Sequence, residues 1–198
     1  MNISIDTLSV LKNFSDINQN ILVKPGNKIQ TISTMKNILA EAEVTEKFES
    51  EFAIYDLPEF LRAVELFEKP ALKFNGGSNV VIASANSKQA IKYFFADKSV
   101  IVAPTKAITT LNLPDVAVVG DGKSIKLVAT DKKNKSSNDY SEIIGETNKK
   151  FTAYFKAENL KLIGDDYDVE ISKQKISHFI NRNKPVQYWI ALEPDSEF

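Results

Sequence analysis

Apolar residues at the start of the chain recur with the spacing of an α-helix. Between residues 6 and 17 polar side chains separate a stripe formed by Leu8, Val10, Leu11, Phe14 and Ile17. Residues three and four positions apart share one face of a helix, so the stripe predicts an amphipathic helix with one buried side.

The pattern then changes to alternation, which is typical of strands. Residues 21–23 and 29–33 flank Lys24-Pro25-Gly26-Asn27, a sequence that favours a tight turn. Residues 38–44 alternate apolar or small side chains with acids, and residues 48–55 continue in the same way. We expect a hairpin followed by further antiparallel strands.

A second helix is predicted to begin at Asp56. Asp56 suits the N-cap, Pro58 suits the first turn and Glu59 completes a capping box. The buried stripe of this helix consists of Leu57, Phe60, Leu61, Val64 and Phe67.

The remaining elements suggest that one structural unit occurs twice. Phe52, Tyr55, Glu59 and Leu61 have counterparts at the same spacing in residues 151–160. We predict strands at 71–74, 80–85 and 91–95, followed by an extended connector at 98–114. After the connector we predict a short helical segment at 157–162 and strands at 116–119, 125–129, 140–145, 150–155, 167–171, 175–180 and 186–192.

These patterns predict an α+β fold of two similar domains, residues 1–97 and 115–198, joined by the connector 98–114. The opening helix has no counterpart in the second domain. Residues 107–114 occupy its place, but they are rich in threonine, end in a proline and are too few for three turns.

Composition narrows the class of protein. The 198 residues are 43% hydrophobic and 26% charged, with a net charge of -1 and no cysteine. These values fit a folded protein without disulfides, and the low net charge still permits a local basic face. No apolar run approaches the length of a membrane span, and the N-terminus lacks the blocks of a signal peptide, so we expect a cytoplasmic protein.

Several segments resemble the sliding clamps of T-even-type bacteriophages. The resemblance rests on Leu11-Lys12-Asn13-Phe14, the strand 53–57, the connector residues 102–104 and the ending Ala191-Leu192-Glu193-Pro194-Asp195-Ser196-Glu197-Phe198. It implies a ring-shaped homotrimer of six similar domains, with antiparallel sheets outside and helices lining a central hole. A family member has four helices per subunit facing DNA, whereas this chain is expected to have three.

The resemblance also implies partners and a location. The ring would encircle double-stranded DNA and tether the phage DNA polymerase after a clamp loader has placed it, in the cytoplasm of the infected bacterial host. Whether transcription proteins also bind is left open by the sequence. A different class of protein, a trimeric phage structural or assembly module that does not bind DNA, fits the composition as well.

A sliding ring needs weak, uniform contacts, because bidentate contacts to base edges would create stopping points. Lysine and arginine facing the hole attract phosphates without sequence preference. The candidates are Lys12 on the first helix, Arg62 on the second, and Lys156 and Lys161 on the expected helix of the second domain. The alternative is that all four are ordinary solvated charges.

A tethering ring also needs a docking pocket for partner peptides. Clamps place it beneath the connector, and a few buried apolar anchors carry most of the affinity. The candidates here are Met35, Ile38, Ile101, Val102, Pro104, Ala191 and Pro194. The alternative is that they fill the seam between the two domains. For the joint between subunits the candidate is strand 91–95, which would otherwise be an internal strand.

Enzymatic interpretations have little support in the sequence. His178 is the only histidine and lies in a strand pattern without an acid nearby in sequence, so a structural role is expected. Asp165, Asp166 and Asp168 lack the spacing of a calcium loop, and no phosphate-binding glycine loop occurs. We expect no catalytic site, cofactor or metal.

Overall fold

The computed structural model describes residues 1–74, 76–84, 89–97, 114–134 and 140–198. The connector residues 98–113 lie outside this set, and so do the predictions made for them. The described elements are α1 (Ile5–Ile17), β1 (Ile21–Val23), β2 (Gly26–Ile32), β3 (Ile38–Phe48), β4 (Phe52–Ile54), α2 (Leu57–Glu65), β5 (Pro70–Phe74), β6 (Asn79–Ser84), β7 (Ala90–Phe94), β8 (Asp115–Asp121), β9 (Ser124–Thr130), β10 (Tyr140–Glu146), β11 (Lys150–Lys156), η2 (Ala157–Asn159), β12 (Tyr167–Ser172), β13 (Ile176–Asn181) and β14 (Val186–Ala191).

Both predicted helices of the first unit (residues 1–97) form, and local signals explain their starts. The side chain of Ser4 caps α1 by accepting a hydrogen bond from the backbone N–H of Thr7 at 3.2 Å. Asp56 caps α2 by accepting from the N–H of Glu59 at 2.7 Å. In each case the cap satisfies a donor that the first helical turn leaves without a partner.

The helix expected in the second unit (residues 115–198) does not form. Residues 157–162 contain only the three-residue 3-10 turn η2. That prediction was wrong because the segment ends at Gly164 before it can present a complete apolar stripe. The described residues therefore contain two α-helices, both in the first unit.

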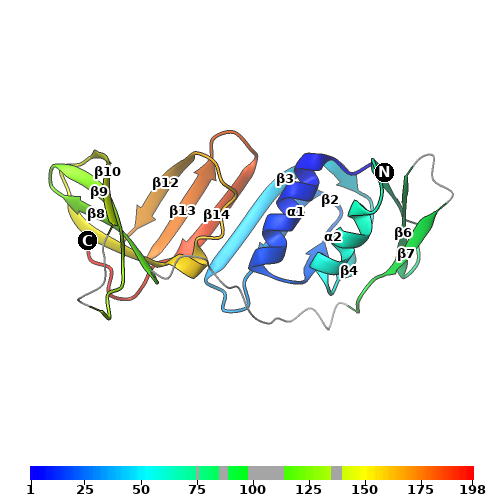
Figure 1. The fold of residues 1–198 in the computed structure, drawn as a ribbon, viewed down its shortest axis with the longest axis horizontal. Coiled ribbons are helices and arrows are strands. Elements are labelled where there is room, and N and C mark those ends of the chain that lie inside the picture. The colour runs from blue at the N-terminus through cyan, green and yellow to red at the C-terminus, as the bar shows by residue number, and fades with distance from the viewer. Residues whose placement is uncertain (75, 85–88, 98–113, 135–139) are drawn as a thin grey trace.

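A five-stranded antiparallel sheet in the order β12-β13-β14-β3-β2 joins the two units. Its centre is the pair formed by β3 of the first unit and β14 of the second, with Leu39 opposite Trp189 and Ala42 opposite Val186. Figure 1 shows this sheet in the middle of an elongated molecule, with β5-β6-β7 at one end and β10-β9-β8-β11 at the other.

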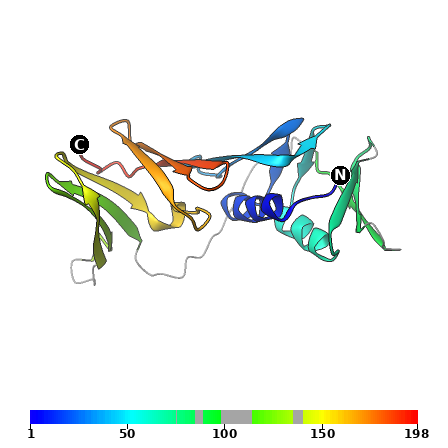
Figure 2. The same cartoon turned by 90° about the horizontal axis from the view of Figure 1, so that it is seen from above.

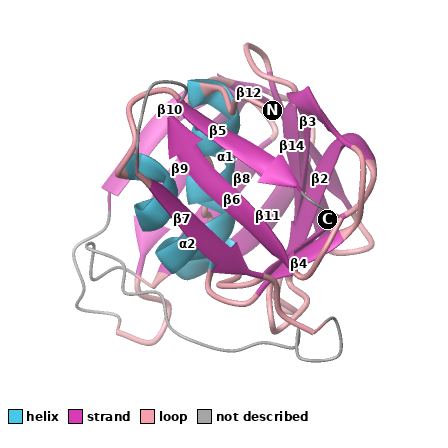
Figure 3. Ribbon diagram, turned by 90° about the vertical axis from the view of Figure 1, so that its right-hand side faces the viewer, coloured by secondary structure: helices cyan, strands magenta, loops and turns pink. Residues whose placement is uncertain are grey.

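The two helices lie on the same side of the five-stranded sheet (Figure 2). In Figure 3, which looks along the long axis, both helices lie to one side of β2, β3 and β14. α1 also contacts the second unit, because the hydroxyl of Tyr188 in β14 donates to the side-chain oxygen of Asn13 at 2.8 Å. Phe14, Ile38, Phe155 and Tyr188 belong to one continuous core.

Segments near both ends of the chain cover sheet edges. Asn2 bridges to Ala71 at the edge of β5. Thr152 and Glu197 exchange two backbone hydrogen bonds of 2.8 Å at the edge of β11. Within the described residues, β7 and β10 are edge strands that no such segment covers.

Glu46 anchors the start of α1 from β3. Its buried carboxylate accepts hydrogen bonds from the N–H of Ser4 at 2.5 Å and from the hydroxyl of Thr7. Burial alone would raise the pKa of Glu46, but these hydrogen bonds outweigh it and the pKa is lowered. A carboxyl with a lowered pKa stabilises the fold above its unfolded pKa, and this stabilisation is lost as the pH falls through the folded value.

We therefore expect Glu46→Ala to lower the free energy of unfolding by roughly 1–3 kcal/mol, since two donors lose their partner. In Glu46→Gln, stability should fall less steeply than in the wild type once the pH drops below the ordinary glutamate value of 4.5. Urea unfolding measured at several pH values tests both statements. Identical acid slopes for Glu46→Gln and wild type would contradict them.

Candidate DNA-facing surface and docking groove

The helices α1 and α2 together form a helical layer, and its exposed side carries a mixture of charges. On α1 the exposed charged residues are Asp6, Lys12 and Asp16. On α2 they are Glu59, Arg62 and Glu65. Each helix therefore presents one basic and two acidic side chains, so the layer is not a basic surface.

Lys12 forms an ion pair with Glu65 that ties α1 to α2. Both side chains are about half exposed, at 55% and 44%, so water screens the pair and it contributes little to stability. The ammonium of Lys12 remains accessible from solvent. Arg62 is also exposed and lies one turn from Glu65 on the same helix.

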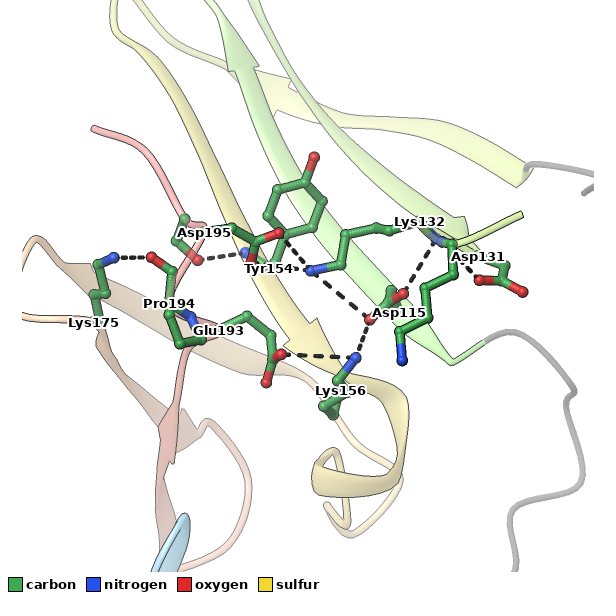
Figure 4. A network of polar contacts seen from close by, with 11 residues as sticks. Asp115, Asp131, Lys132, Tyr154, Lys156, Lys175, Glu193, Pro194 and Asp195 are labelled. Carbon is green, nitrogen blue, oxygen red and sulfur yellow. Dashed lines mark hydrogen bonds and ion pairs between the residues drawn. The ribbon is translucent and has the colours of Figure 1, made fainter. Parts of the chain in front are cut away.

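Lys156 is not on a helix, contrary to the prediction. It is the last residue of β11, and its ammonium lies 2.6 Å from Asp115 and 3.7 Å from Glu193 (Figure 4). Only 1% of the Asp115 side chain is exposed. The hydrogen bond from Lys156 to Asp115 raises the pKa of Lys156, so the ammonium stays protonated at neutral pH.

Lys132 completes the contacts around Asp115. Its backbone N–H donates to Asp115 at 3.2 Å, and its ammonium lies 2.8 Å from Asp195 and 4.2 Å from the ring centre of Tyr154. Figure 4 shows this network joining the start of β8, the segment after β9, the end of β11 and the segment after β14. Its role is to hold these four segments together.

Lys161 lies after η2 rather than on a helix, yet it reaches α1. Its ammonium donates to the backbone oxygen of Asp16 at 2.7 Å, and its own backbone oxygen accepts from the side chain of Asn13 at 3.1 Å. A cation near the last carbonyls of a helix is favourable. Lys161 therefore lies with Lys12 at the helical layer, whereas Lys156 belongs to the network around Asp115.

The outer face of the five-stranded sheet, opposite the helices, carries an apolar row. Alternation along β3 buries Ile38, which is 2% exposed, and turns Leu39 outward at 37%. Ile38 thus packs in the core and offers no surface to a partner. In the sheet register Leu39 lies between Ile32 and Trp189, and Trp189 is followed by His178.

His178 and Trp189 form a parallel stack with ring centres 4.6 Å apart. The ring nitrogens of His178 lie 2.8 Å from Gln187 and 3.3 Å from Glu170. The histidine ring therefore packs against one face of the tryptophan ring. We call the surface formed by Ile32, Leu39, Trp189 and His178 the outer groove.

Other predicted docking residues adjoin this groove. Met35 is 81% exposed in the turn before β3. The N–H of Ala191 donates to the backbone oxygen of Asn37 at 2.9 Å, which brings the end of β14 to the same turn. Pro194 follows, with its oxygen accepting from the ammonium of Lys175. Ile101, Val102 and Pro104 lie outside the described residues.

Sequence reasoning missed Leu39 and Trp189. The alternation of β3 was visible, but the choice of the outward face requires knowing on which face of the sheet α1 packs. Trp189 is the only tryptophan, and an amphipathic aromatic side chain on a half-buried strand was a usable signal.

Two further observations concern other kinds of site. Within the described ranges, no group of three or more histidine, cysteine, aspartate or glutamate side chains could hold a metal ion. No helix in that part of the chain is long and apolar enough to cross a membrane.

Solved structures identify the fold. The chain superposes on PCNA from Thermococcus kodakaraensis with a TM-score of 0.62 at 13% identity, covering 95% of this chain and 96% of that one. For A. fulgidus PCNA bound to the C-terminal region of FEN-1 the TM-score is 0.64 at 12% identity, with 96% of each chain covered. The fold is that of the DNA clamps, as the sequence predicted.

Sequence relatives identify the family. Residues 4–103 match the family of DNA polymerase processivity factors. The chain is 31% identical over 222 residues to the sliding clamp of Vibrio phage KVP40, covering 98% of this chain and 99% of that protein. The sliding clamp of Escherichia phage RB69 is 36% identical over 109 residues, which span 54% of this chain and 47% of that clamp. The chain belongs to the family of DNA polymerase processivity factors.

The network around Asp115 makes a prediction about Lys156. Lys156→Met should lower the free energy of unfolding by roughly 2 kcal/mol, because it leaves a buried carboxylate without its closest cation. Lys161→Met, a matched control at an exposed hydrogen bond, should change it by less than about 0.5 kcal/mol. Chemical denaturation of both variants measures this. Equal effects would show that Lys156 is not a structural residue.

Proposed function

We propose that the chain forms a homotrimeric ring that encircles duplex DNA and tethers a DNA polymerase during synthesis, without catalytic activity of its own. Membership in the processivity factor family supports the tethering role. The main structural support for a ring is the joint between the two units of one chain.

That joint pairs the third strand of the first unit, β3, with the last strand of the second unit, β14. In the repeat, β10 is the third strand of the second unit and β7 is the last strand of the first. Within the described residues no chain segment covers either of these two edges, and they lie at opposite ends of the molecule (Figure 1). An open edge is a template for pairing with another chain.

Pairing β10 of one chain with β7 of the next would therefore repeat the internal joint between chains. Two units per chain then require three chains to close a sixfold arrangement. The side chains are compatible, because β10 exposes Ile143 and β7 exposes Phe94, so that apolar residues would meet at this joint.

DNA would pass the helical layer, where we propose that Lys12, Arg62 and Lys161 face it. These cations stand among acids, so each contact with phosphate would be weak and independent of sequence. Weak contacts suit a protein that must slide, because retention then comes from the closed ring. Lys156 is not among these candidates, because its ammonium is paired with Asp115.

The outer groove is our proposed docking site for partner peptides. A. fulgidus PCNA, which shares the fold, has been solved with the C-terminal region of FEN-1 bound. We propose that the phage DNA polymerase and a clamp loader dock in this groove, with Met35, Ala191 and Pro194 at its rim and the connector residues Ile101, Val102 and Pro104 beside it. Transcription proteins are further candidates for the same groove. The relatives come from phages, so the place of action would be the cytoplasm of an infected bacterium.

One experiment separates the ring from a trimeric structural module that does not bind DNA. The purified chain is loaded onto circular and linear duplex DNA with its cognate loader. A topologically closed ring stays on the circle and runs off the free ends. Equal loss from both substrates would exclude the ring.

The proposed joint predicts the outcome of a charge placed on β10. Wild type should sediment as a trimer of the 22.1 kDa chain, and Ile143→Asp should sediment as a monomer, because a carboxylate cannot be buried at an apolar joint. Ile180→Asp is the matched control, since Ile180 lies on an internal strand of the five-stranded sheet. A wild type that remains monomeric or dimeric at all concentrations would contradict the proposal.

The outer groove predicts a separate phenotype. Leu39→Glu should weaken binding of the polymerase's C-terminal peptide at least tenfold, about 1.4 kcal/mol, because an apolar anchor would face a charge. Lys47→Glu is the control, on the same strand and face but away from Trp189. Calorimetry gives both affinities, and sedimentation checks that the trimer persists. Unchanged affinity in Leu39→Glu would move the docking site elsewhere.

A further inference from the structure

A pocket lies within the second unit, on the opposite side of the five-stranded sheet from the outer groove. It has a volume of about 620 Å³ and opens between the inner faces of two sheets. Its apolar lining comes from Ile125 on β9, Phe151 on β11, and Val169 and Ile171 on β12. Val169 is 46% exposed although its sheet partner Phe179 is buried, so this part of the interior is open to solvent.

The first unit fills the corresponding place. Phe52, the counterpart of Phe151 in the repeat, packs against three other rings. Its ring centre lies 5.6 Å from Phe48, 5.0 Å from Phe74 and 5.1 Å from Phe95. Phe151 has no aromatic ring neighbour in the part of the chain that the structure describes. The second unit therefore keeps one phenylalanine of the cluster and leaves space where the others would pack.

The rim of the pocket is basic. Lys149, Lys150 and Lys173 line it, and no acidic side chain does so among the described residues. These lysines also form no ion pair within the described ranges, although Asp121 and Glu197 line an adjoining pocket with Lys150. The remaining lining residue is Phe198, which is 40% exposed.

An apolar recess with a basic rim selects for a particular ligand chemistry. The lining offers contacts to an aromatic or aliphatic side chain, and the pocket volume is in the range of known ligand sites. The lysines favour carboxylates on either side of that anchor. Duplex DNA shares the negative charge but presents its phosphates, not an apolar side chain, to a protein surface.

We propose that this pocket binds an acidic segment of a partner protein through one aromatic side chain, which takes the place that the phenylalanine cluster fills in the first unit. The site goes beyond the clamp function and does not depend on ring closure. A partner could therefore hold this pocket while another occupies the outer groove.

Binding of a probe peptide to the full chain tests the proposal. The probe is acetyl-Asp-Asp-Phe-Asp-Asp-amide, and methyl NMR reports on Ile125, Val169 and Ile171. The probe should shift these methyl signals at submillimolar to millimolar concentrations. A probe with alanine in place of phenylalanine should bind much more weakly because it lacks the aromatic anchor. A probe with lysines in place of aspartates should also bind much more weakly because it lacks the negative charges.

Two variants test the two halves of the site. Val169→Phe should abolish binding by filling the recess, as the first unit does. Lys150→Glu should weaken binding about fivefold, because a favourable charge pair becomes a repulsion. Lys133→Glu, an exposed lysine away from the pocket, is the charge-matched control and should bind as wild type does.

Three results would overturn the proposal. The first is the absence of shifts at the three reporter residues at millimolar probe. The second is equal binding by Val169→Phe and wild type. The third is a short DNA duplex, or raised concentration of the chain alone, shifting the same methyls as strongly as the probe, which would make DNA or a second copy the occupant. None of these readouts requires a ring, so retention on circular DNA can hold or fail independently.

Discussion

The antiparallel pairing of β3 with β14 is the interaction on which the rest of the molecule depends. It joins β2-β3 of the first unit and β12-β13-β14 of the second into one five-stranded sheet. Buried residues on one face of the pair, including Ile38, Tyr188 and Ile190, supply the surface on which α1 packs. The opposite face places Leu39 beside Trp189. A single register thus positions both the helical layer and the outer groove, and a shift by one residue would exchange the two faces.

The charges are divided between surfaces in a way that the net charge does not reveal. The helical layer mixes acids and bases, and its most central lysine is paired with Glu65. Lysines that form no ion pair within the described residues gather instead at the far end of the second unit. The buried Asp115 lies between these regions and uses Lys132 and Lys156 to fix the segments around it. Basic residues in this chain therefore have at least three different tasks, although they look alike in the sequence.

Much of the fold could be predicted because its signals are local. The apolar stripes and the caps Ser4 and Asp56 mark the helices, and alternation marks the strands. The repeat of Phe52 at Phe151 indicated two similar units. What failed depended on tertiary context: residues 157–162 lack the length to hold a helix, and Lys156 is drawn into a network with Asp115, which is 41 positions away in sequence.

The candidate site was less accessible to sequence reasoning than the fold. Ile38 and Leu39 are adjacent apolar residues, and only the packing of α1 decides which of them faces outward. The pocket beside Phe151 could not be found from sequence, since it is defined by side chains that are missing relative to the first unit. The connector residues proposed for docking lie outside the described residues and remain predictions.

The two uncovered edges have a consequence for how such an assembly can fail. Contacts between unlike edges are heterologous, so nothing in β7 or β10 themselves limits the number of chains that can join. Closure depends on the bend that each joint imposes, and the joint inside the chain sets half of those bends. A substitution that flattened the β3–β14 pairing by a few degrees would leave every contact intact. The product would then be an open helical filament.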